Sequence, residues 1–306
     1  MATRFNWHAK PWNTASVPDI VFSAKGMIGP EERRMLYFVA ANRGNNDAIV
    51  DAGSYLGAST LSLAAGAAAR GHRRKVVVAY DFFKAMDQYV VDAISKDFRP
   101  IEKGESYLDI FLSQTQSHSK YIDVRPGDFL QQKWDGGDIS ILFVDIAKTP
   151  ALNAHVFAEF FPALRPGSFI IQQDYHHAWH PYMQICMELV DDYLELVDSR
   201  VHFQSRAWQL KTKIPPKLLA RCQPGTLTED EGCSLLDNVI AKSQTSEEAG
   251  MLMTTKLWYL VLARQHRAAA SLVENIEKSF DTSSPDIWAR QFSKVKELAI
   301  ARNGEQ

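Results

Sequence analysis

The sequence is short of cysteine and of long apolar runs, and each shortage excludes a class of protein. Only three of the 306 residues are cysteines, and Cys186, Cys222 and Cys233 show no CxxC spacing, which argues against a disulfide framework and a structural zinc site. No apolar stretch reaches the roughly 20 residues of a membrane span, and the first residues lack the apolar core of a signal peptide. We therefore expect a soluble, cytoplasmic protein without a membrane partner, in which the three thiols are buried.

The sequence also lacks an excess of charge of either sign. It has 34 Lys and Arg residues against 36 Asp and Glu residues, a net charge of −2 at pH 7, and no dense block of basic residues. Proteins that bind the phosphate backbone of nucleic acids concentrate positive charge, so nucleic acid is disfavoured as a partner. The length suits one large domain, or a domain of common size with a sizeable extension.

Short apolar runs alternate with helical segments through the first two thirds of the chain. This alternation predicts a doubly wound α/β domain, a parallel sheet covered by helices on both faces. The expected strands lie at residues 48–53, 75–82, 121–128, 139–147 and 168–175, and the segment 194–212 resembles a pair of closing strands. Helices are expected from Pro30 to the residue before Gly44, at 56–70, at 150–164 and after 175 as far as about 193.

The remaining segments flank or interrupt this domain. We expect an irregular N-terminal segment at 1–29, the α/β domain at 30–214 and a helical C-terminal extension at 215–306. The segment 84–119 is longer than a simple crossover and contains an inserted helix, which is either a lid over a site or a surface embellishment. The extension has a wide apolar face around residues 250–276, which packs on the α/β domain or forms a homodimer interface.

Helix starts in the extension are marked by capping signals. Thr228 precedes Glu231 and Thr245 precedes Glu248 at the spacing of a capping box, and Ser284 stands directly before Pro285.

The strongest local signal is the stretch "IVDAGSYLGAST", in which the first strand ends at Asp51. Gly53 and Gly57 allow a tight turn into the next helix and a close approach of a ligand to the backbone. The spacing Gly-x-x-x-Gly matches neither the Gly-x-Gly-x-x-Gly of dinucleotide-binding folds nor the Gly-Lys-Ser/Thr of a P-loop. Because Asp81 and Asp128 follow the next two strands, three carboxylates at successive strand ends predict a nucleoside site at a topological switch point.

Four segments in order, "VDAGSYLGAST", "VVVAYDF", "DVRPGDF" and "ILFVDIAKT" with "LRPGSFIIQQDY", resemble the class I S-adenosylmethionine-dependent methyltransferases over residues 30–200. The resemblance implies a Rossmann-like methyltransferase sheet and S-adenosyl-L-methionine as the cofactor. It also implies that the glycine turn holds the methionine part, that Asp81 holds the ribose and that Asp128 holds the adenine. The expected cofactor-binding residues are Asp51, Gly53, Ser54, Gly57, Ser59, Asp81, Asp128, Phe129 and Asp145, with helix capping and packing as an alternative role for Ser59.

Asp145 and Asp174 follow the fourth and fifth strands and are expected to face each other. They resemble the acids with which bacterial methyltransferases of sugar hydroxyls hold a divalent metal, in the patterns Asp-x-Asp and Asp-Asp. Here Ala147 and Gln173 replace one acid of each pattern. One carboxylate from each strand remains, so a divalent metal stays open, with Asp145 and Asp174 as its ligands if it is present.

The stretch "QQDYHHAWHPY" places three histidines directly behind the fifth strand. A neutral histidine is suited to remove a proton from an acceptor, so His177 or His176 is our candidate base, with helix capping or packing on Trp179 as the alternative. Lys148 either contacts the acceptor or pairs with an acid, and His180 is expected to start the next helix. The aromatic side chains of this stretch either stack on a sugar ring or pack in the core; they are Tyr175, Trp179 and Tyr182.

These expectations describe an O-methyltransferase that uses S-adenosylmethionine. Its acceptor would be small and polar, for example a sugar hydroxyl in glycan or natural-product biosynthesis. Because two acids are replaced, a catalytically inactive cofactor-binding scaffold or regulatory protein with the same fold is the alternative. A short-chain oxidoreductase is disfavoured, since no Tyr-x-x-x-Lys follows the fourth strand.

Overall fold

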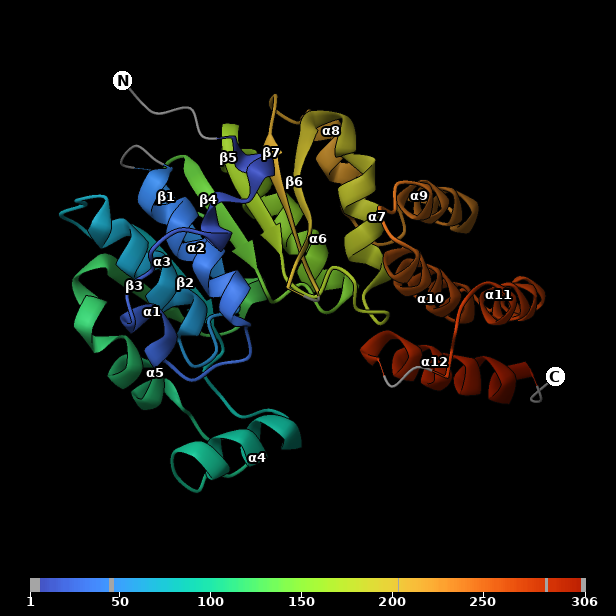
Figure 1. Ribbon diagram of the computed structural model, residues 1–306, viewed down its shortest axis with the longest axis horizontal. Coiled ribbons are helices and arrows are strands. Elements are labelled where there is room, and N and C mark those ends of the chain that lie inside the picture. The colour runs from blue at the N-terminus through green and yellow to red at the C-terminus, as the bar shows by residue number, and fades with distance from the viewer. Residues whose placement is uncertain (1–5, 44–46, 203, 284–285, 304–306) are drawn as a thin grey trace.

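The structure is a computed structural model that describes residues 6–43, 47–202, 204–283 and 286–303. The described residues form a seven-stranded sheet in the order β3-β2-β1-β4-β5-β7-β6 (Figure 1). β1 to β5 run parallel, and β7 runs antiparallel to both β5 and β6, so the expected sheet and closing strands are confirmed. The strands are β1 (Ala48–Ala52), β2 (Val77–Asp81), β3 (Ile122–Pro126), β4 (Ile139–Val144), β5 (Leu164–Gln172), β6 (Leu194–Val201) and β7 (Ser205–Leu210).

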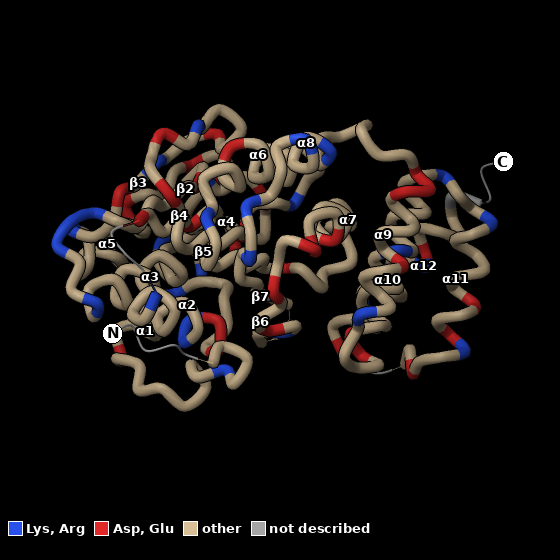
Figure 2. The backbone as a smooth tube through the Cα atoms, turned by 90° about the horizontal axis from the view of Figure 1, so that it is seen from above, with Lys and Arg blue, Asp and Glu red and all other residues tan. Residues whose placement is uncertain are grey.

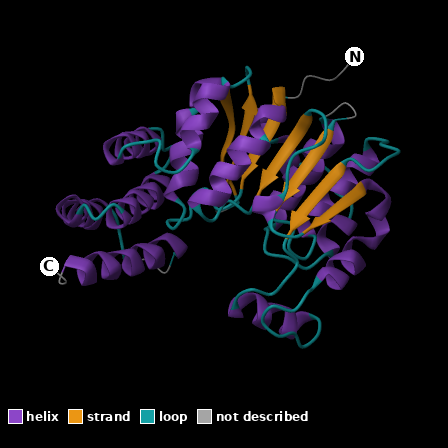
Figure 3. Ribbon diagram, turned by 180° about the vertical axis from the view of Figure 1, so that it is seen from behind, coloured by secondary structure: helices purple, strands orange, loops and turns teal. Residues whose placement is uncertain are grey.

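Helices cover both faces of the sheet, as Figures 1 and 3 show. One face packs on α1 (Ile20–Ser23), α2 (Pro30–Asn42), α3 (Ala58–Ala69) and α5 (Leu108–Thr115). The other packs on α6 (Pro150–Glu159) and α7 (Pro181–Leu189). Because β4 is sandwiched between the two layers, all six of its residues are buried, which explains why all but Ser140 are apolar.

The carboxyl ends of the central strands meet at one edge of the sheet. In the register of β1 and β4, Ala52 lies beside Val144, and Val144 lies beside Gln172 of β5. The chain passes from β1 outward to β2 and β3, and then returns to β4 on the other side of β1. This reversal is a topological switch point, where open α/β sheets bind their ligands.

The segment 84–119 contains two helices where the sequence predicted one clear insertion. α5 packs on α3 in the core, whereas α4 (Gln88–Asp97) lies beyond the sheet, and only Ile94 of this helix is buried (Figure 1). Met86, Tyr89 and Phe98 beside it are exposed. The choice between a lid and a surface embellishment stays open.

The C-terminal helices are α8 (Pro216–Leu219), α9 (Glu229–Ala241), α10 (Ser246–Leu262), α11 (His266–Ser279) and α12 (Ile287–Asn303). α9 and α10 contact α7, and Val239 and Leu252 join the core cluster of the sheet, so the extension packs in part on the α/β domain. α11 and α12 pack on α10 around a second cluster. The division at residue 215 stays a proposal. Cys186 and Cys222 are buried as expected, but Cys233 is only half-buried.

Short 3-10 helices complete the described chain. They are η1 (Trp7–Ala9), η2 (Pro11–Asn13), η3 (Gln116–Tyr121), η4 (Phe129–Gln131), η5 (Phe161–Ala163), η6 (Asp191–Tyr193) and η7 (Ala220–Cys222). Although irregular, the N-terminal segment is anchored, because Trp12 is buried in the core. Lys and Arg residues are interspersed with Asp and Glu residues along the chain (Figure 2). None of the described helices is both long and apolar enough to cross a membrane.

Of the three capping signals that the sequence marks, one capping box is formed, one is formed in part and one lies outside the described residues. Thr228 and Glu231 form the expected capping box at α9. At α10 the Thr245 side chain accepts a bond from the Glu248 backbone, but the Glu248 carboxylate accepts its bond from Gln244 N–H instead of closing the box. Gly44, Ser284 and Pro285 lie outside the described residues.

Candidate active site

Neighbouring atoms lie so close to the two glycines of the turn after β1 that a larger residue would not fit at either position. Gly53 and Gly57 have φ angles of 104° and 97°, in the left-handed region. A Cβ atom on Gly53 would lie 2.8 Å from the carbonyl carbon of Asp145, and one on Gly57 would lie 2.7 Å from Cγ2 of Thr115. The turn is thus closely packed between the end of β4 and the helix α5.

Asp51 is a buried carboxylate, and only one of its two oxygens is hydrogen-bonded to the described residues. Its Oδ2 accepts hydrogen bonds from Ser59, at 3.0 Å, and from the Thr60 hydroxyl. Its Oδ1 has no hydrogen-bond partner among the described residues. Burial raises the pKa of Asp51 to about 7, although both hydroxyls oppose this shift. A buried acceptor without a partner is costly, so a ligand with a cationic N–H donor fits this atom.

Ser54 and Ser59 lie on either side of this carboxylate. The Ser54 hydroxyl is buried and donates to the main-chain oxygen of Asp51 at 3.1 Å. The Ser59 hydroxyl donates to the side chain of Asp51, as described above. Both hydroxyls therefore shape the turn, and neither is directed into an open space in this structure.

Asp81, at the end of β2, joins the glycine turn to the inserted segment. Its Oδ2 accepts the Tyr55 N–H at 2.8 Å, and its Oδ1 accepts the Phe83 N–H at 2.7 Å and the Tyr107 hydroxyl at 2.8 Å. Burial raises the pKa of Asp81, and these three donors oppose the shift. The Phe82 N–H opposes the shift as well, so four donors of the chain surround this carboxylate.

Asp128 and Phe129 follow β3 and differ in accessibility. Asp128 is exposed, and its Oδ1 accepts the Leu130 N–H at 3.0 Å as the cap of η4. The Phe129 ring is 3% exposed and stacks on Phe160 at a centroid distance of 5.3 Å. The ring is therefore part of the core, which leaves only the main chain of Phe129 to meet a ligand.

At the ends of β4 and β5 one lysine bridges the two remaining acids. The Lys148 Nζ donates to Oδ1 of Asp145 at 2.7 Å, to Oε1 of Gln173 at 3.0 Å and to Oδ2 of Asp174. Asp174 has a φ of 59°, an uncommon left-handed conformation for a residue other than glycine. Asp145 and Asp174 therefore face each other, with an ammonium between them.

The charges of this cluster stabilise one another. Burial raises the pKa of Asp145 to about 7, against the attraction of Lys148. Burial also opposes ionisation of Asp174, but the Lys148 ammonium outweighs it and holds the pKa of Asp174 below its ordinary value. For Lys148, burial works to lower the pKa, and the two carboxylates raise it. The lysine is consequently charged at neutral pH.

The cluster does not fit a resident divalent metal. Among the residues that the structure describes, no group of three or more His, Cys, Asp or Glu side chains is arranged to hold a metal ion. Asp145 and Asp174 bind Lys148 instead, and the methyl group of Ala147 is buried where the related pattern has an acid.

The three histidines behind β5 have different surroundings. His176 is buried, with Nε2 at 3.2 Å from Oε1 of Glu248 and Nδ1 at 3.3 Å from the Gln204 carbonyl. His177 is half-buried, its ring stacks on His180 at 5.1 Å, and its Nδ1 has no partner among the described residues. His180 precedes α7 as expected, and its Nδ1 lies 3.2 Å from the Lys148 carbonyl.

Burial sets the protonation of these rings. Burial lowers the pKa of His177. The charge of Lys148 lowers this pKa further, whereas the charge of Asp174 works to raise it. Burial likewise lowers the pKa of His180 to about 4 and lowers the pKa of His176, although Glu248 works against the latter shift. All three rings are neutral at pH 7; His177 and His180 are both partly exposed, and the buried Nδ1 of His177 has no partner among the described residues.

The aromatic residues of the same stretch pack on the protein. The Tyr175 ring is buried against Trp208 at 5.1 Å. Trp179 contacts Trp258 at 5.0 Å, and Tyr182 contacts Tyr259 at 6.1 Å. These contacts account for the three rings without a bound sugar.

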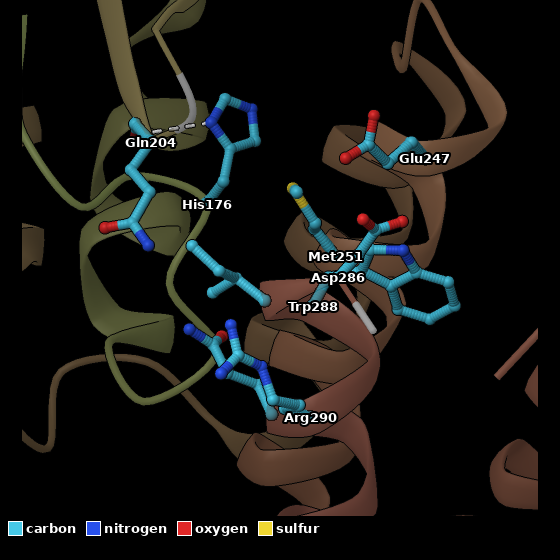
Figure 4. Close-up of a pocket in the computed structure, with 9 residues that line it drawn as sticks. His176, Gln204, Glu247, Met251, Asp286, Trp288 and Arg290 are labelled. Atoms are coloured by element: carbon cyan, nitrogen blue, oxygen red, sulfur yellow. Dashed lines mark hydrogen bonds between the residues drawn. The ribbon is translucent and has the colours of Figure 1, made fainter. Parts of the chain in front are cut away.

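The loop at residues 173–180, which we call the histidine loop, follows β5. A cavity of about 180 Å³ lies between this loop and the C-terminal helices (Figure 4). The loop is tied to α12, because the Ala178 N–H donates to Oε1 of Gln291 at 2.9 Å. The lining residues are His176, Gln204, Glu247, Met251, Asp286, Ile287, Trp288, Arg290 and Gln291.

Sequence reasoning missed several members of the site. Thr60 could have been included, since it directly follows Ser59 in the glycine stretch. Tyr107 and Gln291 carry no local signal, because they meet the site only through folding. Glu248 was interpreted only as a helix cap.

A parallel sheet with this strand order, an adjoining antiparallel pair of strands and a glycine turn at the switch point are typical of the Rossmann-like methyltransferase fold. Residues 50–175 match the family model described as a methyltransferase domain. This part of the chain is therefore similar to methyltransferases. A search of curated proteins found no match.

Three solved structures have a similar fold. The O-methyltransferase NovP is 15% identical, with 61% of this chain and 82% of that chain covered at a TM-score of 0.47. CalS11, a calicheamicin methyltransferase, is 15% identical, with coverages of 66% and 89% and a TM-score of 0.45. Cofactor-bound Rv0187 from MTB is 15% identical, with coverages of 68% and 88% and a TM-score of 0.42. At these identities the likeness concerns the fold alone.

Proposed function

We propose that this protein transfers the methyl group of S-adenosylmethionine to an oxygen of a small polar acceptor. The observation that carries the proposal is the pair of carboxylates at the switch point. Asp51 is buried and has an unpartnered Oδ1, and the half-buried Asp81 ends the neighbouring strand. Such acceptors suit the ammonium group and the ribose hydroxyls of this cofactor.

Within this proposal the cofactor lies along the carboxyl ends of β1 to β3. Asp51 would receive the ammonium group, next to the turn formed by Gly53, Ser54 and Gly57. Asp81 would hold the ribose, and the exposed Asp128 would meet the adenine. The bound cofactor supplies an electrophilic methyl group, and the chain positions it beside the ends of β4 and β5.

His177 is our proposed general base. The cofactor would supply the methyl group that the acceptor oxygen takes up, and the imidazole of His177 would accept the proton that this oxygen loses. The lowered pKa keeps His177 neutral, and the ring is partly exposed and makes no hydrogen bond through its buried Nδ1 to the described residues. His176 is less suited, because its buried ring already faces Glu248.

The acceptor class is inferred from the polar groups around the histidine loop. Gln173, Asp174, His177 and His180 supply donors and acceptors that match hydroxyl groups better than apolar surface. A sugar hydroxyl in glycan or natural-product biosynthesis fits this chemistry. The aromatic rings add no support, since they pack on the protein.

Two measurements test the proposal. Titration calorimetry with S-adenosylmethionine and S-adenosylhomocysteine tests cofactor binding, and transfer of a labelled methyl group to a panel of glycosides and other hydroxylated compounds tests activity. We expect one cofactor molecule bound per chain and label in at least one acceptor. Binding without transfer to any acceptor would favour the inactive scaffold, and no binding would contradict both alternatives.

A further inference from the structure

We infer that Lys148 is a built-in counter-ion that takes the place of a divalent metal at the acceptor end of the site. In this chain, methyl transfer then needs no metal ion. The inference rests on the proposed function for its catalytic consequence, but the exclusion of metal is a property of the folded protein that can be measured without an acceptor.

The hydrogen bonds of Lys148 use its full donor capacity. An ammonium group has three N–H donors, and Asp145, Gln173 and Asp174 supply three acceptors. Two of these acceptors are carboxylates from neighbouring strand ends, which is where the resemblance places the ligands of a metal. The lysine holds them together as a cation would.

Gln173 makes the arrangement specific to a lysine. The amide oxygen at this position accepts the third N–H of Lys148, whereas an acid there would add a third negative charge. Ala147, the other replaced acid, is buried and adds no ligand. The two departures from the metal-binding pattern therefore remove two charges and leave two carboxylates bridged by one ammonium.

A divalent ion has no place in this cluster while the lysine is present. Mg²⁺ requires near-octahedral oxygen ligands and is usually held by one or two carboxylates with water. Oδ1 of Asp145 and Oδ2 of Asp174 are bound to Nζ, and a cation between them would meet the ammonium charge directly. The other oxygen of each carboxylate lies outside the lysine bonds and is suited to an acceptor hydroxyl.

Lys148 is consequently a positioning residue. With all three donors engaged, it acts through Asp145 and Asp174, whose spacing and charge it sets. The proton of the acceptor still passes to His177, and the electron pair of the broken carbon–sulfur bond stays on sulfur, so the balance of the reaction does not involve a metal.

The test is the binding of Mn²⁺, followed by the electron paramagnetic resonance signal of the free ion. The variants are Lys148→Met, which removes the charge but keeps an unbranched chain, and Lys148→Arg, which keeps the charge. Lys242→Met is the matched control, because Lys242 also bridges two acids, Glu188 at 2.6 Å and Asp191 at 2.8 Å, on the surface. Circular dichroism and thermal melting check that each variant is folded.

We expect the native protein, Lys148→Arg and Lys242→Met to leave the Mn²⁺ signal unchanged, and Lys148→Met to bind the ion. Stoichiometric Mn²⁺ binding by the native protein would overturn the inference. Equal binding by Lys148→Met and Lys242→Met would also overturn it, because any exposed pair of acids would then suffice. If Lys148→Met does not fold, the native protein and Lys148→Arg still decide the matter.

Activity supplies an independent readout once an acceptor is found. Turnover by the native protein should be unchanged by a chelator such as EDTA. Turnover by Lys148→Met should fall by about 10- to 100-fold, the equivalent of a lost charged hydrogen bond, and should recover in part with Mg²⁺. Loss of native turnover on chelation would contradict the inference, whereas absence of cofactor binding would contradict only the proposed function.

Discussion

The two halves of the site hold their carboxylates in different ways. In the cofactor half, at the ends of β1 and β2, Asp51 and Asp81 are held by hydroxyl and N–H donors that carry no charge. In the acceptor half, at the ends of β4 and β5, Asp145 and Asp174 are held by the ammonium of Lys148. The described residues therefore supply no cation to the carboxylates of the first half, whereas a lysine bridges those of the second.

This difference indicates which half awaits a cation. S-adenosylmethionine carries a sulfonium and an ammonium group, and a buried carboxylate with only neutral partners favours such a ligand. The acceptor half already contains its cation and is suited to a neutral, hydroxylated molecule. At one edge of the sheet, carboxylates with only neutral donors thus lie beside carboxylates bridged by a lysine. Variants that change only one of these two groups test the distinction.

The largest effect is expected from His177→Gln, which alters only the acceptor half. Loss of a general base lowers kcat by about 10²- to 10⁴-fold, and the affinity for S-adenosylmethionine should stay the same. In the native protein the rate should fall as the pH drops through the lowered pKa of His177, below 6.5, because the protonated ring cannot accept a proton. His72→Gln, in the loop before β2, is the control. A loss of cofactor affinity equal to the loss of kcat would mean that His177 is structural.

The next largest effect is expected from Gly57→Ala, which disturbs the turn of the cofactor half. The added Cβ is strained by the positive φ and meets Thr115 and Phe111, so the free energy of unfolding should drop by about 2–5 kcal/mol. Gly71→Ala isolates the strain, because Gly71 has a φ of 89° and nothing within 4 Å of its Cβ position. Urea unfolding measures both. An equal decrease in the free energy of unfolding of the two variants would show that contacts with α5 do not add to the backbone strain at Gly57.

A smaller effect is expected from Asp81→Asn. Losing the charge on this acceptor should weaken S-adenosylmethionine binding by about 10- to 100-fold, as measured by calorimetry. Tyr107→Phe, which removes one donor to Asp81 and leaves its charge, should change the affinity by less than about 10-fold. If the two variants were equivalent, Asp81 would serve the inserted segment and not the cofactor.

Much of the cofactor half could be predicted from the sequence, because its signals are local. The glycine turn, the strand before it and Asp81 lie within short runs of apolar and turn residues, and parallel strands bring their carboxyl ends to one edge. The prediction of Asp51 at the end of β1 follows from the same reasoning. The structure adds Thr60 and Tyr107, which donate to these acids.

The acceptor half could be predicted only in outline. Lys148 and Asp174 are far apart in the sequence, and their contact depends on the left-handed turn at Asp174, which no glycine announces. The sequence offers His176 as a candidate base. It does not reveal that the His176 ring faces Glu248, which comes from α10 in the C-terminal helices. Local patterns do not encode such pairs, because long-range packing creates them.

The most direct test of the account is calorimetric titration of S-adenosylmethionine into the native protein and into Asp81→Asn, each with and without EDTA. The account predicts one molecule bound per native chain, the same affinity with and without EDTA, and an affinity at least about 10-fold weaker in the variant. No binding by the native protein, or equal affinity in the two proteins, would contradict it.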